Sequence, residues 1–394
     1  MPDIKAPLPL LMTPGPVPAP PSVLRALSAP IEHHRTPAFQ KCFDRVIGAL
    51  PGVFQTKNRA FMHVSTGTGG MESLLVNVLS PGDEVAAVVS GKFGERWADM
   101  AEAFGAKVER LDIEWGESVH LPTFTAWLEK RKPKIVLSQV CETSTGALHP
   151  IREMAQAVRR LHSDCLFLVD AITALGAMPL PMDEWDIDGV VGGSQKAFMI
   201  PTGLSFVALS ERAWARAQTA KCPRFYFDLR AEDEANRRGE TGFSSAVPLI
   251  KALDVVLAEV TTFGLPLLYK RITTLAQATR EAMQILGLRI FPSTSSPSLT
   301  AILVPDSIDG QKWRSVLETK HGVVLMGGQD QMKGKLLRMG HMGFIRDTDL
   351  ITAITAIVHA GREIGWECSD EKLAAALNTA REILSETPSP WSET

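Results

Sequence analysis

The chain has 394 residues, of which 45% are hydrophobic and 22% are charged, and its formal net charge at pH 7 is −3. This length is enough for a large hydrophobic core and for two or three domains. The composition is that of an ordinary soluble protein, which argues against a disordered or membrane protein, and the small net charge gives no electrostatic basis for binding nucleic acid.

Cysteine usage and the N-terminus bear on the compartment. The five cysteines are scattered without C-x-x-C spacing, at positions 42, 141, 165, 222 and 368. Such a set predicts reduced, mostly buried thiols and neither a zinc site nor a disulfide framework. The N-terminus lacks the charged and apolar regions of a signal peptide, and no apolar run reaches the length of about 18 residues that a membrane span requires. We therefore expect a cytoplasmic protein.

Proline is concentrated in residues 7–21, with Thr13-Pro14-Gly15-Pro16-Val17 at the centre. Such a segment cannot sustain a helix, so it is either an extended arm that forms a wall of a site or a floppy tail. Helical patterning begins near Ser22 and resumes over residues 39–53. Between the two, His33-His34-Arg35 could touch a substrate carboxylate, although a solvated loop between helices explains the same residues.

A strand, a turn and a helix follow one another from residue 61. Phe61–Val64 is predicted as a strand, and it leads through Ser65-Thr66-Gly67-Thr68-Gly69-Gly70 into a helix over Met71–Leu79. The free amides and the dipole of a helix N-terminus favour an anion, so this turn is a candidate phosphate site. It matches neither the nucleotide P-loop nor the G-x-G-x-x-G fingerprint.

Strands and helices then alternate. Strands are predicted at 84–89, 107–111, 134–140, 165–169, 189–191 and 204–209, and helices at 94–104, 124–130 and 151–161. This alternation is typical of an α/β fold with a doubly wound, mainly parallel sheet between helices. In such folds the loops at the carboxyl ends of the strands carry the site.

Two residues at that edge have complementary chemistry. Asp170 ends a buried strand, and Lys196 closes the turn Gly192-Gly193-Ser194-Gln195-Lys196. An enzyme that uses pyridoxal 5′-phosphate (PLP) needs an aspartate for the pyridinium nitrogen and a lysine for the cofactor aldehyde. A strand-end aspartate and a lone lysine are also common in proteins without a cofactor, so the pair alone leaves both interpretations open.

Other residues are predicted to lie at the same edge or to carry buried charge. Phe93 follows a strand in a predicted loop, where it either stacks on a cofactor ring or packs in the loop. Glu142-Thr143-Ser144-Thr145-Gly146 brings hydroxyl groups to the sheet edge. Arg338 lies inside an apolar strand, where its guanidinium requires a carboxylate from either the protein or a substrate.

The pattern changes after about residue 221. Residues 224–246 are charged and are predicted to be irregular, and long helices are predicted at 247–262 and 265–286. Beyond them, strands at 299–304, 322–326 and 335–339 and helices at 311–320 and 348–361 predict a smaller α+β domain. The predicted division is an extended arm at 1–21, a large cofactor-binding domain at 22–264 and a small domain at 265–394.

Taken together, these motifs resemble those of the class V aminotransferases, a family of fold-type I PLP enzymes, and within it the alanine/serine:glyoxylate (serine–pyruvate) branch. The likeness covers nearly the whole chain. It is carried by Pro14-Gly15-Pro16, Val53-Phe54-Gln55-Thr56-Lys57-Asn58, Glu142-Thr143-Ser144-Thr145-Gly146, Asp170, Ser194-Gln195-Lys196 and Leu337-Arg338-Met339-Gly340.

The resemblance implies a role for each matching residue. Lys196 would form a Schiff base with the cofactor and carry the proton between the substrate Cα and C4′, and Asp170 would pair with the pyridinium nitrogen. Phe93 would stack on one face of the ring, where relatives often have tryptophan, and Ile172 would pack on the other. The implied phosphate ligands are Thr66, Gly67, Thr68 and Gln195; Thr143 would approach the ring hydroxyl, and Arg338 would grip the substrate α-carboxylate.

The resemblance also implies a homodimer whose sites lie at the subunit interface, with the proline-rich arm of one chain reaching toward the other. Relatives often present a tyrosine and a threonine of the neighbouring subunit to the phosphate. Here Phe243 stands in place of that tyrosine and Ala246 near the threonine. Either Ser244 or Ser245 compensates, or the phosphate is held less tightly.

The predicted function is therefore PLP-dependent, ping-pong transfer of an amino group from alanine or serine to glyoxylate or pyruvate. Alternatives in the same family are a 2-aminoethylphosphonate or aspartate transaminase and a lyase of the cysteine desulfurase type. A desulfurase requires a reactive cysteine on a mobile loop, and the only cysteine beyond Cys222 is Cys368. It also usually has histidine where this chain has Gln195. A further alternative is a PLP-binding subunit of a larger complex, since some similar chains have been linked to hydrogenase preparations.

Overall fold

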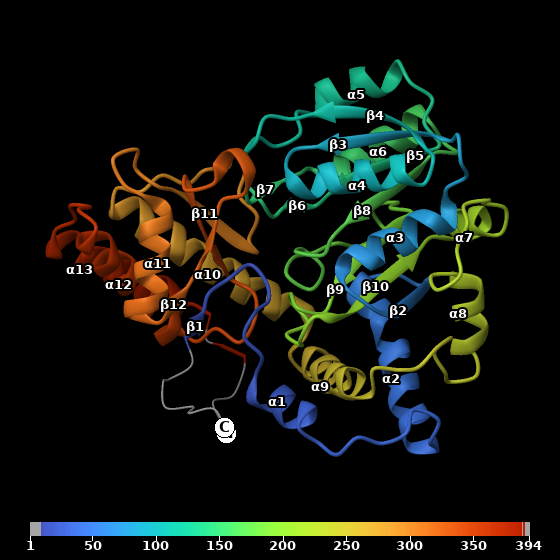
Figure 1. Cartoon of the computed structure of the whole chain (residues 1–394), viewed down its shortest axis with the longest axis horizontal. Coiled ribbons are helices and arrows are strands. Elements are labelled where there is room, and N and C mark those ends of the chain that lie inside the picture. The colour runs from blue at the N-terminus through green and yellow to red at the C-terminus, as the bar shows by residue number, and fades with distance from the viewer. Residues whose placement is uncertain (1–8, 388, 391–394) are drawn as a thin grey trace.

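A seven-stranded sheet forms the centre of the larger of two lobes (Figure 1). The structure is a computed structural model that describes residues 9–387 and 389–390. From one edge to the other, the strands are β2 (Arg59–Ser65), β10 (Gly203–Leu209), β9 (Gly189–Gly193), β8 (Leu166–Asp170), β5 (Ile135–Gln139), β3 (Glu84–Val89) and β4 (Lys107–Asp112). Strand β10 is antiparallel to both of its neighbours, β2 and β9, and the other strand pairs are parallel. The predicted mainly parallel sheet is therefore confirmed.

Side chains on these strands alternate between two hydrophobic clusters, as the two-residue period of a strand requires. In β3, Ala86 and Val88 belong to one cluster, and Val85 and Ala87 belong to the other. The first cluster is covered by α2 (Pro37–Phe54), α5 (Leu121–Glu129), α6 (Ile151–Leu161) and α9 (Val247–Phe263). The second is covered by α3 (Gly67–Val78), α4 (Lys92–Ala103), α7 (Glu211–Ala217) and α8 (Leu229–Asn236). Both faces of the sheet are thus buried, which explains why its central strands are almost continuously apolar.

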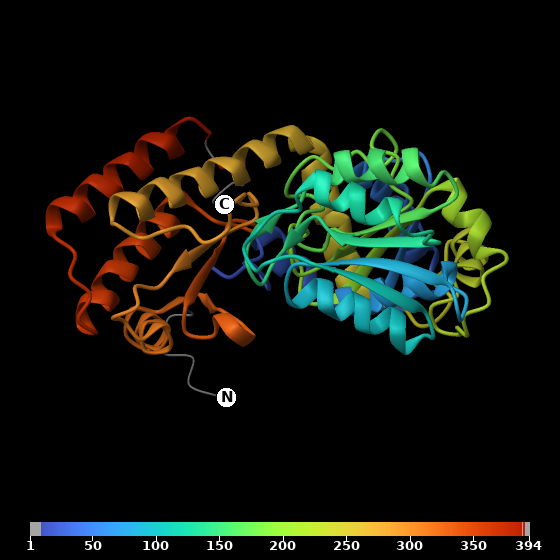
Figure 2. The same ribbon diagram turned by 90° about the horizontal axis from the view of Figure 1, so that it is seen from above.

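The smaller lobe is built around an antiparallel sheet of β11 (Leu299–Leu303), β14 (Leu336–Gly340) and β13 (Met326–Gly327), in that order. Its helices are α10 (Leu265–Ile285), α11 (Gly310–His321), α12 (Asp347–Glu363) and α13 (Asp370–Ser385). They enclose a separate hydrophobic cluster that includes Trp313 and Ile354. Figure 2 shows the two lobes side by side, with α10 leading from one into the other.

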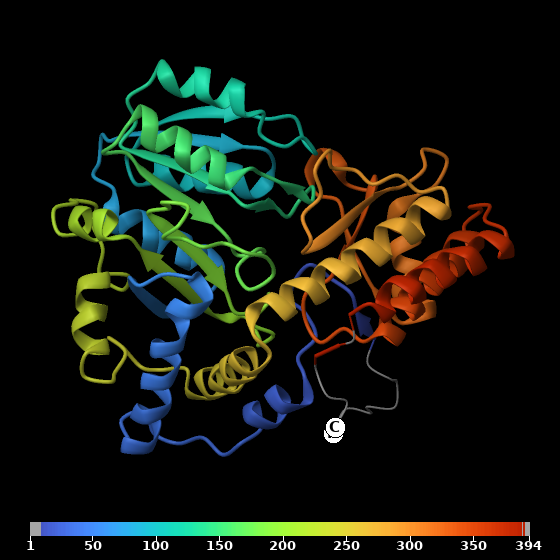
Figure 3. The same cartoon turned by 180° about the vertical axis from the view of Figure 1, so that it is seen from behind.

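The two lobes meet at a helix break. Helices α9 and α10 are separated only by Gly264 and are bent by 92° relative to each other, as Figure 3 shows from behind. The first turns of α10, with Leu268 and Ile272, still pack in the large-lobe cluster, and the small-lobe cluster begins on this helix at Leu275. Because the chain changes direction at the break, we propose that the domain boundary falls here, between residues 264 and 265. Among the described residues, no single helix has the length and hydropathy to cross a membrane; α9 and α10 meet that test only as a bent pair.

Most predicted elements have the expected type, with three instructive differences. Residues 224–246 were expected to be irregular but contain α8, whose N-terminus is capped when the Asp228 side chain accepts a hydrogen bond from the Arg230 amide. The strand expected at 322–326 is split into β12 (Val323–Val324) and β13, on either side of the buried Leu325. Helix α3 begins at Gly67, four residues before its expected start, because glycines hide the helical periodicity there.

The proline-rich arm packs against its own chain. Residues Leu10–Leu11 form β1, which pairs in parallel with β12, and Met12 is buried in the small-lobe cluster. The short helix α1 (Pro21–Leu27) then leads into the large lobe. Residues 1–8 of the predicted arm lie outside the described residues. The described part forms a wall of a site within its own chain, and its expected reach toward a second chain stays a prediction.

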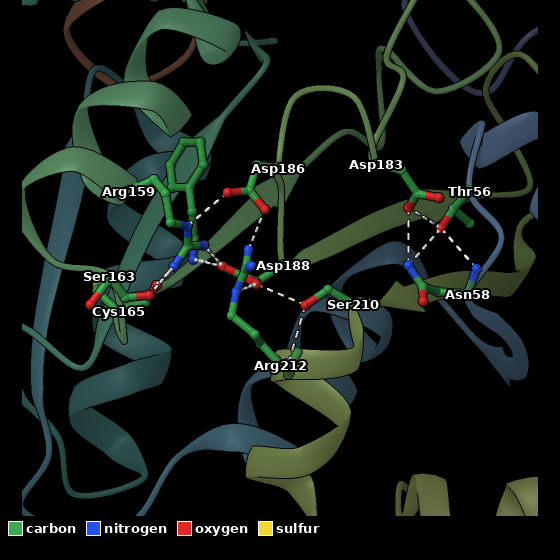
Figure 4. Close-up of polar contacts among 12 residues, drawn as sticks. Thr56, Asn58, Arg159, Ser163, Cys165, Asp183, Asp186, Asp188, Ser210 and Arg212 are labelled. Carbon is green, nitrogen blue, oxygen red and sulfur yellow. Dashed lines mark hydrogen bonds and ion pairs between the residues drawn. The ribbon is translucent and has the colours of Figure 1, made fainter.

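A buried carboxylate, Asp188, connects several elements at the amino end of β9 (Figure 4). Asp188 precedes β9, is fully buried, and accepts hydrogen bonds from the Phe167 amide at 2.9 Å and the Ser210 hydroxyl at 2.7 Å. It also pairs with Arg159 at 2.8 Å and Arg212 at 2.9 Å. Asp186 pairs with the same two arginines but is half exposed. Asp188 therefore joins the start of β9 to β8, to α6 and to the N-terminus of α7.

A second carboxylate, Asp183, holds the end of α2 to the segment before β9 (Figure 4). It accepts hydrogen bonds from the Thr56 hydroxyl at 2.5 Å, the Lys57 amide at 2.8 Å and the Asn58 side chain at 3.0 Å. These residues belong to the motif that ends in Asn58. Their role in this structure is therefore to connect the helix to the sheet.

We predict that Asp188→Asn destabilises the protein much more than Asp186→Asn. The first change leaves buried donors and two arginines without their counter-charge, for which a loss of about 3–5 kcal/mol is typical. The second removes partly exposed pairs and should cost less than about 1 kcal/mol. Urea denaturation of both variants, with PLP present, measures the difference. Equal shifts of the two midpoints would show that Asp188 does not hold the sheet together.

Candidate functional site

Lys196 lies in the turn between β9 and β10, at the carboxyl edge of the parallel strands. Its side chain is only 9% exposed, and its Nζ donates a hydrogen bond to the Pro14 carbonyl at 2.6 Å. Burial, together with the positive charge of Arg338, lowers the pKa of the amine to about 8. A substantial fraction of this lysine is thus an uncharged, nucleophilic amine near neutral pH.

The proline-rich arm lies between Lys196 and strand β14. The Gly340 amide donates to the Met12 carbonyl at 2.9 Å, and Gly15 has a φ of +133°. A Cβ atom on Gly15 would come within 2.3 Å of the Lys196 Nζ, and one on Gly340 within 2.1 Å of the Thr13 carbonyl oxygen. Glycine is required at both positions because the arm approaches so closely. The arm therefore forms the wall of the site that faces the small lobe.

Asp170 is the last residue of β8, as expected, and its side chain is almost fully buried. Among the described residues, only the Ile172 amide donates a hydrogen bond to its carboxylate, at 2.9 Å. Burial raises the pKa of Asp170 to about 7, and the nearby Glu142 carboxylate adds to that rise. This carboxylate is therefore short of a donor or a positive partner in the site.

The turn after β2 forms the N-terminus of α3. Thr66 is the N-cap residue, but its side chain makes no capping hydrogen bond. The first-turn amides of Gly67 and Thr68 have no partners within the helix, so they are available to a ligand. Ile172 packs over this turn, since a Cβ on Gly67 would come within 2.7 Å of its Cδ1. The Gln195 side chain lies nearby, and its buried Oε1 has no hydrogen-bond partner among the residues described.

Phe93 lies in the first turn of α4, which corrects the expectation that it belongs to a loop. The correction has a physical cause. The Glu142 carboxylate accepts hydrogen bonds from the Phe93 amide and the Gly94 amide, both at 3.1 Å, and so caps a helix whose own N-cap is Gly91. A cap supplied by a residue far along the chain leaves no local signal in the sequence.

Glu142 has more contacts than its place in the sequence motif suggested. Its carboxylate is fully buried and also accepts hydrogen bonds from the Ser144 amide at 3.0 Å and the Ser144 hydroxyl at 2.6 Å. Burial raises its pKa. The side chain therefore fixes the Phe93 turn and the Thr143 loop relative to each other. Thr143 itself shares a hydrogen bond of 2.5 Å with the Thr173 hydroxyl.

Arg338 reaches the site from β14 of the small lobe. It is buried, its Nε donates to the Gly327 carbonyl at 2.9 Å, and one terminal nitrogen donates to the Thr143 carbonyl at 2.6 Å. Burial lowers its pKa to about 10, against the favourable charge of Glu142. Among the described residues, no carboxylate pairs with it at salt-bridge distance. The alternative of a structural ion pair is thus not found in that part of the chain, and several N–H donors remain for a ligand.

Arg96 is a residue at this edge that the sequence interpretation did not single out. It lies one helical turn after Phe93 on α4, with its guanidinium 4.9 Å from the centre of the Phe93 ring. Its Nη1 donates to the Thr68 hydroxyl at 3.2 Å. The spacing of three residues between Phe93 and Arg96 on a helix is the signal that would have indicated it.

Two groups of residues that the sequence suggested for the site have other partners in the structure. Arg35 pairs with Glu240 at 3.6 Å and is exposed, and His33 is exposed and stacks on His34, which favours the solvated-loop interpretation. Phe243 is also exposed and stacks on Tyr226.

Ser244 and Ser245 differ in their surroundings. Ser245 shares a hydrogen bond of 2.7 Å with the Thr241 hydroxyl, whereas Ser244 is exposed in the same loop. Ser244 is therefore the freer of the two for a contact outside its own chain.

Comparison with known proteins agrees with this geometry. The aminotransferase class-V family matches residues 31–347. The chain is 37% identical to the small subunit of a soluble hydrogenase from Synechococcus sp., over 91% of this chain and 94% of the relative. It is 31% identical to serine–glyoxylate aminotransferase of Hyphomicrobium methylovorum, over 96% and 95% of the two chains.

A solved structure is similar over the whole fold. The crystal structure of ureidoglycine–glyoxylate aminotransferase from Bacillus subtilis superimposes with a TM-score of 0.91 and 31% sequence identity, covering 97% of this chain and all of that one. The matched region of the class-V family includes both lobes and every residue of the candidate site from Thr66 to Arg338. The chain therefore belongs to the class V aminotransferases and is a PLP-dependent enzyme of fold-type I.

Proposed function

We propose that this aminotransferase moves an amino group from a small amino acid, alanine or serine, to glyoxylate or pyruvate in two half-reactions. The observation that carries the proposal is the buried Lys196 amine, whose pKa is lowered to about 8 and which shares its sheet edge with the buried Asp170. A serine–glyoxylate aminotransferase among the relatives supports the choice of substrates.

The residues present fit PLP. Asp170 is a buried carboxylate with one hydrogen-bond donor, and a protonated pyridine nitrogen would supply the missing partner. The first turn of α3 offers amides to a phosphate, with Thr66, Gly67, Thr68 and Gln195 as ligands. Phe93 and Ile172 would flank the ring, and Thr143 would approach its hydroxyl group.

When bound, PLP supplies a ring that takes up the electrons left on the substrate Cα after its proton departs. Lys196 would be the covalent attachment point and then the base that moves this proton. Asp170 would keep the ring nitrogen protonated. Arg338 would hold the substrate α-carboxylate with two parallel hydrogen bonds, from donors that Gly327 and Thr143 do not use.

The structure gives a desulfurase no suitable nucleophile. All five cysteines are free, and Cys42, Cys141, Cys165 and Cys222 are buried. Burial raises the pKa of Cys368, which is half buried against the small-lobe cluster. A reactive thiol requires the opposite, an exposed site with a lowered pKa. Reduced cysteines also support our proposal of a cytoplasmic location.

A role as a subunit of a larger complex is the second candidate, and the relative named as a hydrogenase subunit is the observation that favours it. The chain nevertheless has Lys196, Asp170 and Arg338 in surroundings suited to catalysis. A chain that served only as a subunit would have no need of an amine with a lowered pKa. We therefore place transamination first, with or without a partner.

We further propose a homodimer. Phe225, Tyr226 and Phe243 form a cluster of exposed rings, with Phe225 83% exposed and 5.8 Å from the Phe243 ring. The cluster adjoins the edge strand β2, because the Tyr226 hydroxyl donates to the Val64 carbonyl at 3.3 Å. Exposed aromatic rings at a sheet edge favour burial against a second copy of the chain. In such a dimer, Ser244 would be available to the partner's site.

The first experiment identifies the amino donor. The PLP-loaded protein is mixed with 15N-labelled alanine, serine, aspartate or 2-aminoethylphosphonate, first alone and then with glyoxylate or pyruvate. We expect one amino acid to release its 2-oxo acid in an amount equal to the enzyme, and the acceptor to receive the label in the second step. Mass spectrometry measures both.

Lys196→Arg, which keeps the positive charge but cannot act as the base, should reduce label transfer by at least about a thousandfold. Transfer at the wild-type rate by Lys196→Arg would refute the assignment of Lys196. If no donor transfers label although PLP is bound, transamination itself would be ruled out for these substrates, and the subunit hypothesis would move ahead.

The lowered pKa of Lys196 predicts how cofactor capture depends on pH. The nucleophile is the uncharged amine, so protonation at low pH slows the reaction. With a pKa of about 8, about a tenth of the amine is free at pH 7, whereas the ordinary value of 10.5 would leave less than about a thousandth. The rate of covalent PLP attachment to the cofactor-free protein should rise from pH 6 and level off slightly above pH 8.

Borohydride reduction and peptide mass mapping measure that attachment at Lys196. The same titration of Nα-acetyl-lysine corrects for ionisations of PLP itself. A rate that keeps rising to pH 10 in parallel with the free amino acid would contradict the lowered pKa.

The dimer proposal predicts that charge in the aromatic cluster weakens association. Sedimentation velocity of the wild-type protein should give twice the chain mass of 42.9 kDa. Phe225→Asp combined with Phe243→Asp should raise the dissociation constant by about 30-fold or more, as loss of buried aromatic anchors does. Arg381→Asp, on the exposed side of α13, is the control and should leave the mass unchanged. A monomeric wild-type protein would disprove the proposal.

A further inference from the structure

Arg96 lies between two parts of the proposed cofactor site. Its guanidinium lies 4.9 Å from the centre of the Phe93 ring, and its Nη1 donates to the Thr68 hydroxyl at 3.2 Å. Phe93 is the proposed stacking residue, and Thr68 lies in the first turn of α3, where the phosphate would bind. One side chain thus contacts the residues assigned to the ring and to the phosphate.

The other basic residues around α4 have carboxylate partners. Lys92 pairs with Glu95 at 2.9 Å and with Asp330 at 3.1 Å. Arg110 pairs with Asp99 of the same helix at 2.7 Å. Within residues 9–387 and 389–390, by contrast, Arg96 has no carboxylate at salt-bridge distance, although it is half buried. The nearby Asp170 carboxylate, whose pKa burial raises and the charge of Arg96 helps to lower, is the acidic group that Arg96 acts on, but the two form no ion pair. The guanidinium therefore has no direct counter-ion among these residues, whereas its basic neighbours do.

The position of this charge is unfavourable unless an anion binds. The guanidinium contacts Thr68 at the N-terminus of α3, and a helix N-terminus carries about half a positive charge. Two positive groups that face each other repel, and their hydrogen bond to a neutral hydroxyl offsets little of that repulsion. A dianionic phosphate in the same place would attract both the guanidinium and the helix N-terminus.

We propose that Arg96 is a further phosphate-binding residue, which grips the PLP phosphate from the α4 side while its contact with Phe93 fixes the ring that stacks on the cofactor. A guanidinium on one face of the Phe93 ring leaves only the other face for the cofactor. The proposal rests on the cofactor site proposed above and not on the identity of the amino donor. It also explains how the phosphate is held where Phe243 and Ala246 replace hydroxyl-bearing residues.

The test compares ligands with and without a phosphate. Full-length protein from which PLP has been removed is titrated with PLP, with pyridoxal and with inorganic phosphate as a competitor of PLP, and binding is followed by cofactor absorbance. The variants are Arg96→Gln, Arg96→Lys and Arg110→Gln, the last being a matched control that removes a paired arginine beside the same helix.

We expect Arg96→Gln to raise the dissociation constant of PLP by about 10- to 100-fold, as loss of a charge-assisted hydrogen bond does. The affinity for pyridoxal should change by less than about twofold, and inorganic phosphate should cease to compete. Arg96→Lys should lie between the wild type and Arg96→Gln, because it keeps the charge but loses the planar fork. Arg110→Gln should bind all three ligands as the wild type does.

Two results would overturn the proposal. If Arg96→Gln weakens PLP and pyridoxal equally, Arg96 acts only through the Phe93 ring; if it weakens neither, Arg96 has no part in cofactor binding. Circular dichroism checks that each variant folds, and if Arg96→Gln does not, a selective loss of PLP affinity in Arg96→Lys must appear instead. Measuring these affinities requires no amino donor, so the result is independent of the transamination experiment.

Discussion

The burial of the Lys196 amine is the constraint on which the rest of the site depends. An amine buried without a ligand loses its hydration, and the single hydrogen bond to the Pro14 carbonyl replaces only part of it. Three separate parts of the chain create this environment: the turn after β9, the proline-rich arm and β14 behind it. The arm and β14 have glycine at their points of closest approach, Gly15 and Gly340. Loss of any one would admit water and return the lysine to its ordinary, protonated state.

Burial also shifts the pKa values of the charged groups at the carboxyl ends of the strands. Asp170 and Glu142 are buried carboxylates whose pKa values are raised, and Lys196 and Arg338 are buried cations whose pKa values are lowered. None of the four is fully satisfied by the others. Glu142 completes its coordination with backbone amides and Ser144, so it is structural, whereas Asp170, Arg338 and Arg96 retain unused hydrogen-bonding capacity. Residues with unused hydrogen-bonding capacity are therefore the ones that we expect to bind a ligand, whereas Glu142, whose hydrogen bonds are made within the protein, supports the structure of the site.

The sequence predicted the repeating parts of this fold well, because buried strands and amphipathic helices have periodicities that depend on neighbouring residues. The strands β3, β4, β5, β8, β9 and β10, the helices α4, α5 and α6 and the place of Asp170 at a strand end all followed from that pattern. Contacts between distant segments could not be predicted in this way. The cap on α4 comes from Glu142, and the wall beside Lys196 comes from Pro14 and Gly15. The contact of Arg96 with Thr68 on another helix is of the same kind, and its spacing from Phe93 was hidden because Phe93 was expected to lie in a loop.

The pairing of β1 with β12 has a consequence for the order of folding. Leu10 leaves the ribosome long before its partner Val323, which lies far along the chain. The large-lobe sheet, from β2 to β10, is complete long before that, and domains generally fold as they emerge. The arm must therefore wait beside a folded large lobe until the small lobe forms, and only then can Pro14 reach Lys196. The wall beside Lys196 is thus completed late in folding, only after both lobes have formed.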